Sequence, residues 1–254
     1  MAWQLYEAGF GYDFIGGFLF FDRLGSIMSI AQDKFDYSIS PTAANRKELL
    51  VKKSRDGITA KISDDYFYLS QIEPRDFRQS FGVEIKKWLP IVADIISPSS
   101  YEKAKIILDY VWPVKSRDEV FVKLASLESP PFDCIEKESG FGKLMQNANF
   151  VFKSGATWVE CGFFGRAFNV PTPSRQSLDF FNTTKQNELN AKSLFQKKTI
   201  AGVEYSWAVG LKISVIEETP PVPTRENDFS FERIARLMQI AENFHEYVKR
   251  LFKK

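Results

Sequence analysis

The sequence contains few side chains whose type and spacing could break or form covalent bonds. His245 is the only histidine, so a metal site built from several histidines is excluded by the count alone. It follows Phe244 in a helical pattern, with Glu242 and Glu246 nearby. No nucleophile is marked for it, and a position on the flank of a helix is usually solvated. We therefore expect His245 to be a solvated side chain rather than a catalytic base.

A second pattern places carboxylates near a lysine, as some metal-dependent nucleases do. Asp64 or Asp65, followed by Glu84 and by Lys86 two residues later, mimics the spaced acids and lysine that hold magnesium and a water. Such residues must converge from strand ends, whereas Glu84 lies in a helical pattern. Two residues along a helix are about 200° apart, so Glu84 and Lys86 are expected to diverge. Acids that cap a turn and an exposed helix face explain the same residues.

Other cofactor and metal signatures fail on spacing. Gly142 and Lys143 do not form a phosphate-binding loop, because Lys137 stands where the upstream glycine is required and Leu144 where serine or threonine is required. No Gly-x-Gly-x-x-Gly follows a predicted strand, so a dinucleotide fold is unsupported. The two cysteines, 27 positions apart in sequence, are too few for a disulfide scaffold or a zinc site. We expect no cofactor and no metal.

One basic cluster suggests contact with nucleic acid. Lys52, Lys53 and Arg55 lie on a predicted hairpin, with Tyr66 and Tyr68 nearby in the sequence. Basic side chains contact phosphates, and aromatic rings can stack on bases, so this hairpin could touch a nucleic-acid backbone. The net charge of +2 is too small to indicate nucleic acid by itself.

Composition indicates an ordinary globular chain with an unusual number of rings. Of 254 residues, 44% are apolar and 26% charged, and 24 are phenylalanine. These rings should fill an aromatic core, and some could remain for an interface. The most apolar stretch near the N-terminus, 14–21, is far shorter than the roughly 20 residues of a membrane-spanning helix. Without a basic leader or cleavage signal, we expect a cytoplasmic location and no membrane contact.

The first third of the sequence predicts strands. The run 14–21 is aromatic and interrupted by glycine, which suits a buried strand. Between 48–53 and 58–62, the dipeptide 56–57 is Asp-Gly, which supplies the positive φ that tight hairpin turns demand. Residues 66–72 then add a third strand to an antiparallel meander.

Further along, the apolar period becomes that of a helix. Apolar residues recur every three to four positions over 77–95, and Pro90 should kink or break this helix. The next segment, 101–112, fits both a helical period and the alternation of a strand. Ser99 with Glu102 has the spacing of a capping box, so the residues alone favour a helix there.

The second half again predicts strands. Residues 150–153 and 157–161 flank Ser-Gly at 154–155 and form a second hairpin. We expect 200–207 and 208–216 to pair as the last antiparallel strands. The other expected elements are a helix after the capping box of Ser116 and Glu119, a strand at 178–182, a polar loop at 185–198, an extended linker at 220–223 and a long helix at 230–252.

Strands followed by helices, twice, favour the α+β class over alternating α/β. We predict antiparallel sheets in two αβ subdomains with a long C-terminal helix. Residues 1–130 would hold the N-terminal meander and its helices, and residues 131–254 the C-terminal sheet and the terminal helix. One continuous domain is the alternative.

A set of short motifs resembles a known family. Residues 48–51, 54–57 and 62–67 form a strand, an Asp-Gly turn and a strand with an aromatic residue, ahead of the helix after Phe77. Residues 210–215 similarly precede the final helix. This order resembles a sporadically distributed, uncharacterised family of prokaryotic proteins of about this length. The resemblance carries no catalytic residue across, and it implies a strand for the segment that fits both periods.

The shortage of catalytic spacing and the abundance of rings favour a non-enzymatic binding or assembly protein. An accessory subunit of a prokaryotic multi-component system, for instance of the defence type, would fit. Because aromatic residues are enriched at interface hot spots, we expect a protein partner or self-association. A nucleic-acid-binding protein that uses the basic hairpin is the first alternative, and a carboxylate-based, metal-dependent nuclease is the second.

Overall fold

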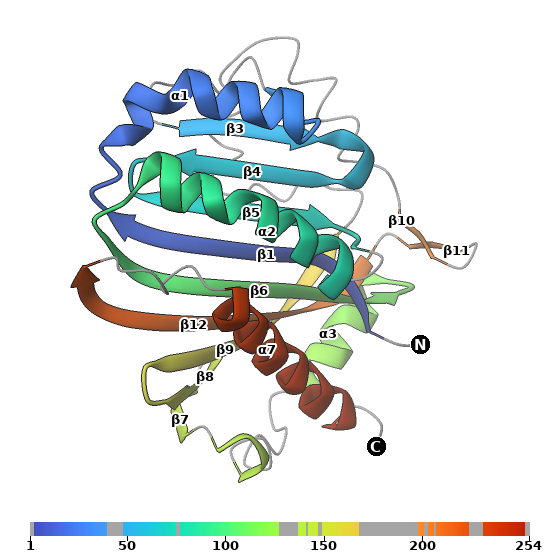
Figure 1. Cartoon of the computed structure of the whole chain (residues 1–254). Coiled ribbons are helices and arrows are strands. Elements are labelled where there is room, and N and C mark those ends of the chain that lie inside the picture. Colours follow the sequence, from blue (N-terminus) through green and yellow to red (C-terminus); the bar gives the residue numbers. More distant parts are fainter. Residues whose placement is uncertain are drawn as a thin grey trace.

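The computed structural model describes residues 3–39, 48–74, 77–126, 137–140, 142–146, 149–167, 198–200, 203–205, 207–223 and 231–251. Its main strands are β1 (Gln4–Ile15), β2 (Ser38–Ile39), β3 (Glu48–Lys53), β4 (Ile58–Ser63), β5 (Tyr66–Ile72), β6 (Ser100–Val114), β7 (Gly142–Gln146), β8 (Asn149–Ser154), β9 (Thr157–Ala167) and β12 (Trp207–Pro223). They form one antiparallel sheet in the order β2-β3-β4-β5-β1-β6-β12-β9-β8-β7 (Figure 1). A separate short pair joins β10 (Lys198–Ile200) to β11 (Val203–Tyr205).

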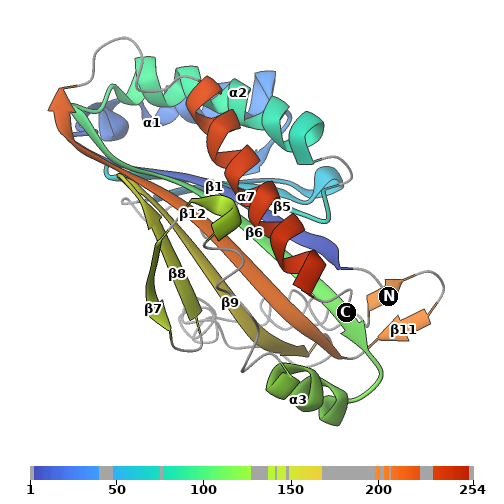
Figure 2. The same ribbon diagram turned by 90° about the horizontal axis from the view of Figure 1, so that it is seen from below.

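The helices are α1 (Leu19–Ser29), α2 (Gly82–Pro90), α3 (Arg117–Ser126) and α7 (Phe231–Leu251). Figures 1 and 2 show α1, α2 and α7 on the same face of the sheet. One continuous core fills the space between the helices and this face. With helices, a large antiparallel sheet and a C-terminal helix all present, the α+β class is confirmed.

The order of elements in the chain occurs twice. The first half of the chain runs through strand β1, helix α1, the meander β3-β4-β5 and helix α2. The second half runs through strand β6, helix α3, the meander β7-β8-β9, the added strand β12 and helix α7. The two leading strands, β1 and β6, pair antiparallel in the middle of the sheet, so each meander lies toward one edge. Strands from both halves of the chain therefore share one sheet.

Both predicted hairpins are confirmed, and their turns show why the local signals sufficed. After β3, a short 3-10 turn (Ser54–Asp56) ends at Gly57, whose φ of 63° lies in the left-handed region. The second hairpin turns at Gly155, with φ 57°. The third strand of the first meander is also confirmed, as β5.

The segment 101–112 is a strand, so the helix favoured by the residues alone is wrong. It lies within β6, which pairs with β1 on one side and β12 on the other. Ser99 caps no helix: its hydroxyl instead donates to the carbonyl oxygen of Ile15 at 2.9 Å. The local pattern fits a helical period and a strand period about equally well. Backbone pairing on both edges, with segments distant in sequence, selects the strand.

The strand predicted at 14–21 is also wrong in extent. Strand β1 starts much earlier and ends at Ile15, and the chain then leaves the sheet at Gly16, whose φ is 75°. The N–H group of Gly17 donates to the carbonyl oxygen of Asp64 at 3.1 Å, and α1 begins two residues later. A short apolar run cannot by itself distinguish a strand from a helix that packs on a sheet.

The predicted helix at 77–95 is present, with a change of helical type at the proline. A π-helical turn (Phe77–Phe81) leads into α2, and a second π-helical segment (Ile91–Ile96) follows Pro90. The missing N–H of proline thus coincides with a wider turn rather than with the end of the helix. The apolar stripe lies in the core, where Trp88 is fully buried.

Of the remaining predictions, some are confirmed, some are wrong, and some fall outside the described residues. The capping box before α3 is present, since Glu119 donates its N–H to Ser116 Oγ at 3.2 Å, and α7 occupies most of the predicted final helix. The pairing of 200–207 with 208–216 is wrong, because β12 pairs with β6 and β9. Rather than a separate linker, 220–223 is the end of β12. The predictions at 178–182 and 185–197 lie outside the described residues.

Across the part of the chain that the structure describes, no helix combines the length and the apolarity needed to cross a bilayer.

Candidate functional site

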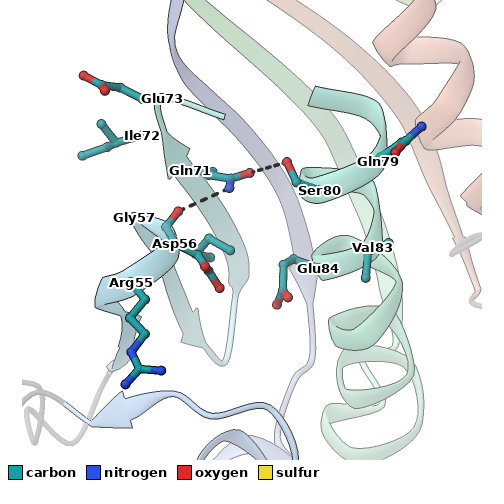
Figure 3. A pocket seen from close by; sticks show the side chains of 11 residues that line it. Arg55, Asp56, Gly57, Gln71, Ile72, Glu73, Gln79, Ser80, Val83 and Glu84 are labelled. Atoms are coloured by element: carbon teal, nitrogen blue, oxygen red, sulfur yellow. Dashed lines mark hydrogen bonds between the residues drawn. The ribbon is translucent and has the colours of Figure 1, made fainter. Parts of the chain in front are cut away.

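An open depression of about 810 Å³ lies where the first hairpin, the end of β5 and the start of α2 meet (Figure 3). The turn after β3 contributes one wall, and Ile72 N–H donates to the carbonyl oxygen of Gly57 at 3.0 Å, which ties that turn to β5. The π-helical turn and the first turn of α2 form the opposite wall. The lining residues are Arg55, Asp56, Gly57, Ile58, Gln71, Ile72, Glu73, Gln79, Ser80, Val83 and Glu84.

The floor of the depression is polar and fixed by hydrogen bonds. Gln71 is only 6% exposed. Its Nε2 donates to the carbonyl oxygen of Asp56 at 3.3 Å, and its Oε1 accepts from Ser80 Oγ at 3.3 Å (Figure 3). One side chain thereby joins the hairpin turn to the helical wall. A buried amide that is bonded at both ends holds a single orientation.

Behind this floor, a buried carboxylate is held by three donors. Glu84 is 5% exposed. Its Oε2 accepts from the Tyr37 hydroxyl at 3.0 Å, while Lys87 Nζ and Lys53 Nζ lie 2.5 and 3.6 Å from its Oε1. Trp88 Nε1 donates to the same phenol oxygen at 3.2 Å. Burial raises the pKa of the Tyr37 hydroxyl well above its usual range, so it remains a donor.

Of the three residues predicted to contact nucleic acid, the structure separates Lys53 from the other two. Lys53 Nζ lies 3.1 Å from Asp56 Oδ2 as well as near Glu84. Burial disfavours its charge, but the hydrogen bond to Asp56 and the charge of Glu84 outweigh this effect and raise the pKa of Lys53. Lys52 and Arg55 are exposed to solvent, and Arg55 lines the depression.

The acids of the nuclease pattern are not brought together. Asp64 follows the last residue of β4, whereas Glu84 lies beside the first residue of that strand in the depression. Six residues of strand separate these ends by roughly 20 Å. Lys86 diverges from Glu84 as predicted, since its ammonium lies 4.1 Å from the ring centroid of Phe231. The exposed helix face expected at Glu84 is wrong, because that carboxylate is buried.

Metal binding finds no support in the described ranges, which hold no group of three or more His, Cys, Asp or Glu side chains able to share an ion.

His245 is 8% exposed and stacks on Tyr110 with ring centroids 3.5 Å apart, so the expectation of a solvated histidine is wrong. Burial, followed by the charge of Lys249, lowers the pKa of His245 to about 4 despite the opposing charge of Glu246. Cys161 is fully buried, and burial raises the pKa of its thiol.

Sequence reasoning missed the residues that shape the depression, although a signal for two of them was present. Gln71 shares the buried face of β5 with Phe67 and Leu69, so it is a polar residue in an apolar alternation. Glu84 likewise stands three residues after Phe81, within the apolar stripe of its helix. A polar side chain on a buried stripe indicates a hydrogen-bonded network, because an unpaired polar group there is costly.

Chemically, the depression combines a fixed polar floor with a rim of mixed character, in which Arg55, Asp56, Glu73 and Gln79 are exposed beside Ile72 and Val83. Ile72 and Val83 are 47% and 50% exposed there, and Arg55 lies at its edge. The carboxylate of Glu84 is already engaged with Tyr37, Lys53 and Lys87, so it is not poised to take a proton from a substrate. The arrangement suits the binding of a surface.

Comparisons with protein-family models, with curated proteins and with solved structures found no match.

Proposed function

We propose that the chain is a non-enzymatic binding and assembly protein, and that a partner protein docks on the depression. The observation that carries this proposal is two exposed apolar side chains, Ile72 on β5 and Val83 on α2, on opposite walls of a depression whose floor hydrogen bonds have already ordered (Figure 3). Binding energy concentrates in small apolar centres with polar surroundings, and arginine is enriched there, as Arg55 would supply. An ordered floor also lowers the entropy lost on association.

The side chains of the depression fit a binding role better than a catalytic role. A general base needs a titratable group within reach of substrate, and a nucleophile needs such a base beside it. The carboxylate of Glu84 is buried between a phenol and two ammonium groups. The hydroxyl of Ser80 donates to the amide of Gln71. These groups stabilise the walls of the depression, which supports a site that recognises rather than transforms.

Single aspartate substitutions at the rim test the proposal. Val83→Asp and Ile72→Asp each place a charge on one of the two walls of the expected contact. Val122→Asp is the matched control, because Val122 is an exposed valine, 69% accessible, on a different helix, α3. Light scattering after size exclusion reports self-association, and affinity purification from cells that naturally make the protein reports a partner.

The expected result is one defined stoichiometric complex that both rim variants abolish and the control retains. A chain that is monomeric and retains no stoichiometric partner would count against the proposal. So would a complex that all three variants preserve. Equal thermal unfolding temperatures of the variants would show that lost binding does not reflect lost folding.

The exposure of Lys52 and Arg55 supports a second candidate, a nucleic-acid-binding protein that uses the hairpin. Because Lys53 is engaged by Asp56 and Glu84, about two phosphate contacts remain for this surface. Two contacts give a slope of log affinity against log salt of roughly −2. A double substitution of Lys52 and Arg55 by alanine should abolish retardation of DNA or RNA at low salt. Retardation that persists in this variant, or its absence in the unmodified protein, would remove the candidate.

A further inference from the structure

A second surface lies at the opposite end of β1 from the depression. We call it the end patch: Ile15, Phe18, Leu19 and Phe21, where β1 ends and α1 begins. Their side chains are 46%, 79%, 40% and 47% exposed. An aromatic side chain offers about 200 Å², so the two phenylalanines alone expose roughly 250 Å². Together the four side chains expose on the order of 400 Å², which is comparable with the largest apolar patches of monomeric proteins, and such patches are often functional.

The end patch is held in place by backbone hydrogen bonds on both sides. Phe14 N–H donates to the carbonyl oxygen of Asp65 at 2.8 Å, and Gly17 N–H to that of Asp64 at 3.1 Å. On the other side, Ser99 N–H donates to the carbonyl oxygen of Ile15 at 2.8 Å. Phe18 is therefore presented from a fixed turn rather than from a mobile loop. Such preorganisation increases affinity because little freedom is lost on binding.

The helix beside the patch leaves room for a partner. Phe18, Phe21 and Gly25 follow one another at helical spacing on the outward side of α1. A side chain added at Gly25 would meet nothing within 4 Å. The two rings therefore lie beside an uncovered helix surface one turn farther along.

Acidic side chains border the patch and set the chemistry of its partner. Asp22 lies one turn after Phe18 on α1, and Arg23 lies one turn after Leu19; both are exposed. Four more acids gather where β1 ends, β4 turns into β5 and β6 begins; they are Asp13, Asp64, Asp65 and Glu102. Lys103 and Lys105 also lie at this end, where both interact with the charge of Asp13, and the ammonium of Lys103 is 3.3 Å from the carboxylate of Glu218. Counting Glu218, six acids against the three bases Arg23, Lys103 and Lys105 leave this end net negative. That charge disfavours anionic lipid surfaces and nucleic acid, whereas basic residues beside an apolar stripe are complementary.

We propose that the end patch docks a basic amphipathic segment of a partner protein, with apolar side chains on Phe18 and Phe21 and lysine or arginine against the acidic border. This surface goes beyond the depression and does not rest on it. Two sites at opposite ends of the same strands would let one chain hold two partners at a fixed separation.

Fluorescence anisotropy with synthetic peptides tests this proposal on the full chain. The probe is a fluorescein-labelled 14-residue peptide of leucine and lysine at helical spacing, and its partner probe carries glutamate at every lysine position. Phe18→Ser combined with Phe21→Ser removes the rings of the patch. Phe121→Ser is the matched control, since Phe121 is 55% exposed on α3. Asp22→Lys reverses one border charge, and Val83→Asp reports on the depression.

We expect the lysine peptide to bind at least tenfold tighter than the glutamate peptide. The double serine variant should lose at least tenfold in affinity, and Asp22→Lys should weaken binding mainly at low salt. Phe121→Ser and Val83→Asp should bind the peptide as the unmodified protein does. Equal binding of both peptides, or unchanged binding by the double variant, would overturn the proposal. Co-sedimentation with phosphatidylglycerol vesicles that the double variant abolishes would instead assign the patch to a membrane surface and also overturn it.

Discussion

Lowering the pH from 7 to 5 should destabilise the protein through its single histidine. In the unfolded chain, His245 titrates near 6.5, whereas burial against Tyr110 lowers its folded pKa to about 4. Between these values the unfolded state binds more protons, so stability falls as the pH falls. Above pH 6.5 the full stability is present, and below pH 4 this group causes no further loss.

The size of the effect follows from the two pKa values. When the folded and unfolded pKa differ by one, the free energy of unfolding changes by about 1.4 kcal/mol, so the full difference approaches about 3 kcal/mol by pH 4. Between pH 7 and pH 5, where most carboxylates remain ionised, the expected loss is about 2 kcal/mol. The groups that face the imidazole are the phenol of Tyr110, the ammonium of Lys249 and the carboxylate of Glu246. None of their ordinary pKa values lies between 5 and 7.

Urea unfolding at pH 7 and pH 5, followed by tryptophan fluorescence at constant ionic strength, measures the loss. His245→Phe is the control variant, because it retains a ring over Tyr110 and cannot titrate. We expect the pH dependence over this range to be smaller by about 2 kcal/mol in the variant. NMR titration gives the folded pKa directly, since the chain has one histidine. A folded pKa near 6, or equal pH dependence in both proteins, would refute the reasoning.

Three further substitutions test contacts of the fold by the same urea measurement. Glu84→Leu leaves the Tyr37 phenol and the Lys87 ammonium without their acceptor and leaves Lys53 with Asp56 alone, and should cost about 3 kcal/mol; a cost below about 1 kcal/mol would mean that the network is dispensable. Glu217→Gln weakens the link from β12 to two arginines of α7 and should cost about 2 kcal/mol, whereas Glu218→Gln, at an exposed pair, should cost under about 0.5 kcal/mol. Gly9→Ala places a methyl group 2.5 Å from the Tyr68 hydroxyl and should cost about 2 kcal/mol; Tyr68→Phe should restore part of that loss, and a double variant no better than Gly9→Ala would contradict the clash.

The elements predicted correctly are those whose signal is local. The hairpin turn at Gly57 requires a left-handed residue, which glycine supplies, and the stripe of α7 repeats over a helix long enough to average out exceptions. Such elements owe their position in the sequence to contacts within a few residues. The first meander was found because three short strands with short connections need no distant partner to be recognised.

The errors arose where partners distant in sequence decide the structure. Strand β6 has apolar residues on both faces near its middle, among them Tyr110 and Val111. Such a strand lies between two others, and its sequence loses the clean alternation of an edge strand. The pairing of β12 was missed for a related reason, because its neighbours β6 and β9 lie far away in the chain. Local patterns state which face is apolar but not which strand lies alongside.

The candidate site was missed because its residues were weighed for chemistry one by one. Glu84 was considered as a metal ligand or as an exposed helix residue, whereas it is buried and its carboxylate accepts a hydrogen bond from Tyr37. A carboxylate on the apolar stripe of a helix must leave water on folding, and that loss is compensated only by donors held in place around it. Lys53 comes from a hairpin 31 positions earlier in the sequence, and Tyr37 from 47 positions earlier. Glu84 on the stripe therefore predicts that other segments supply donors to it, and the hairpin that carries Lys53 also forms one wall of the depression, which the carboxylate links to α2.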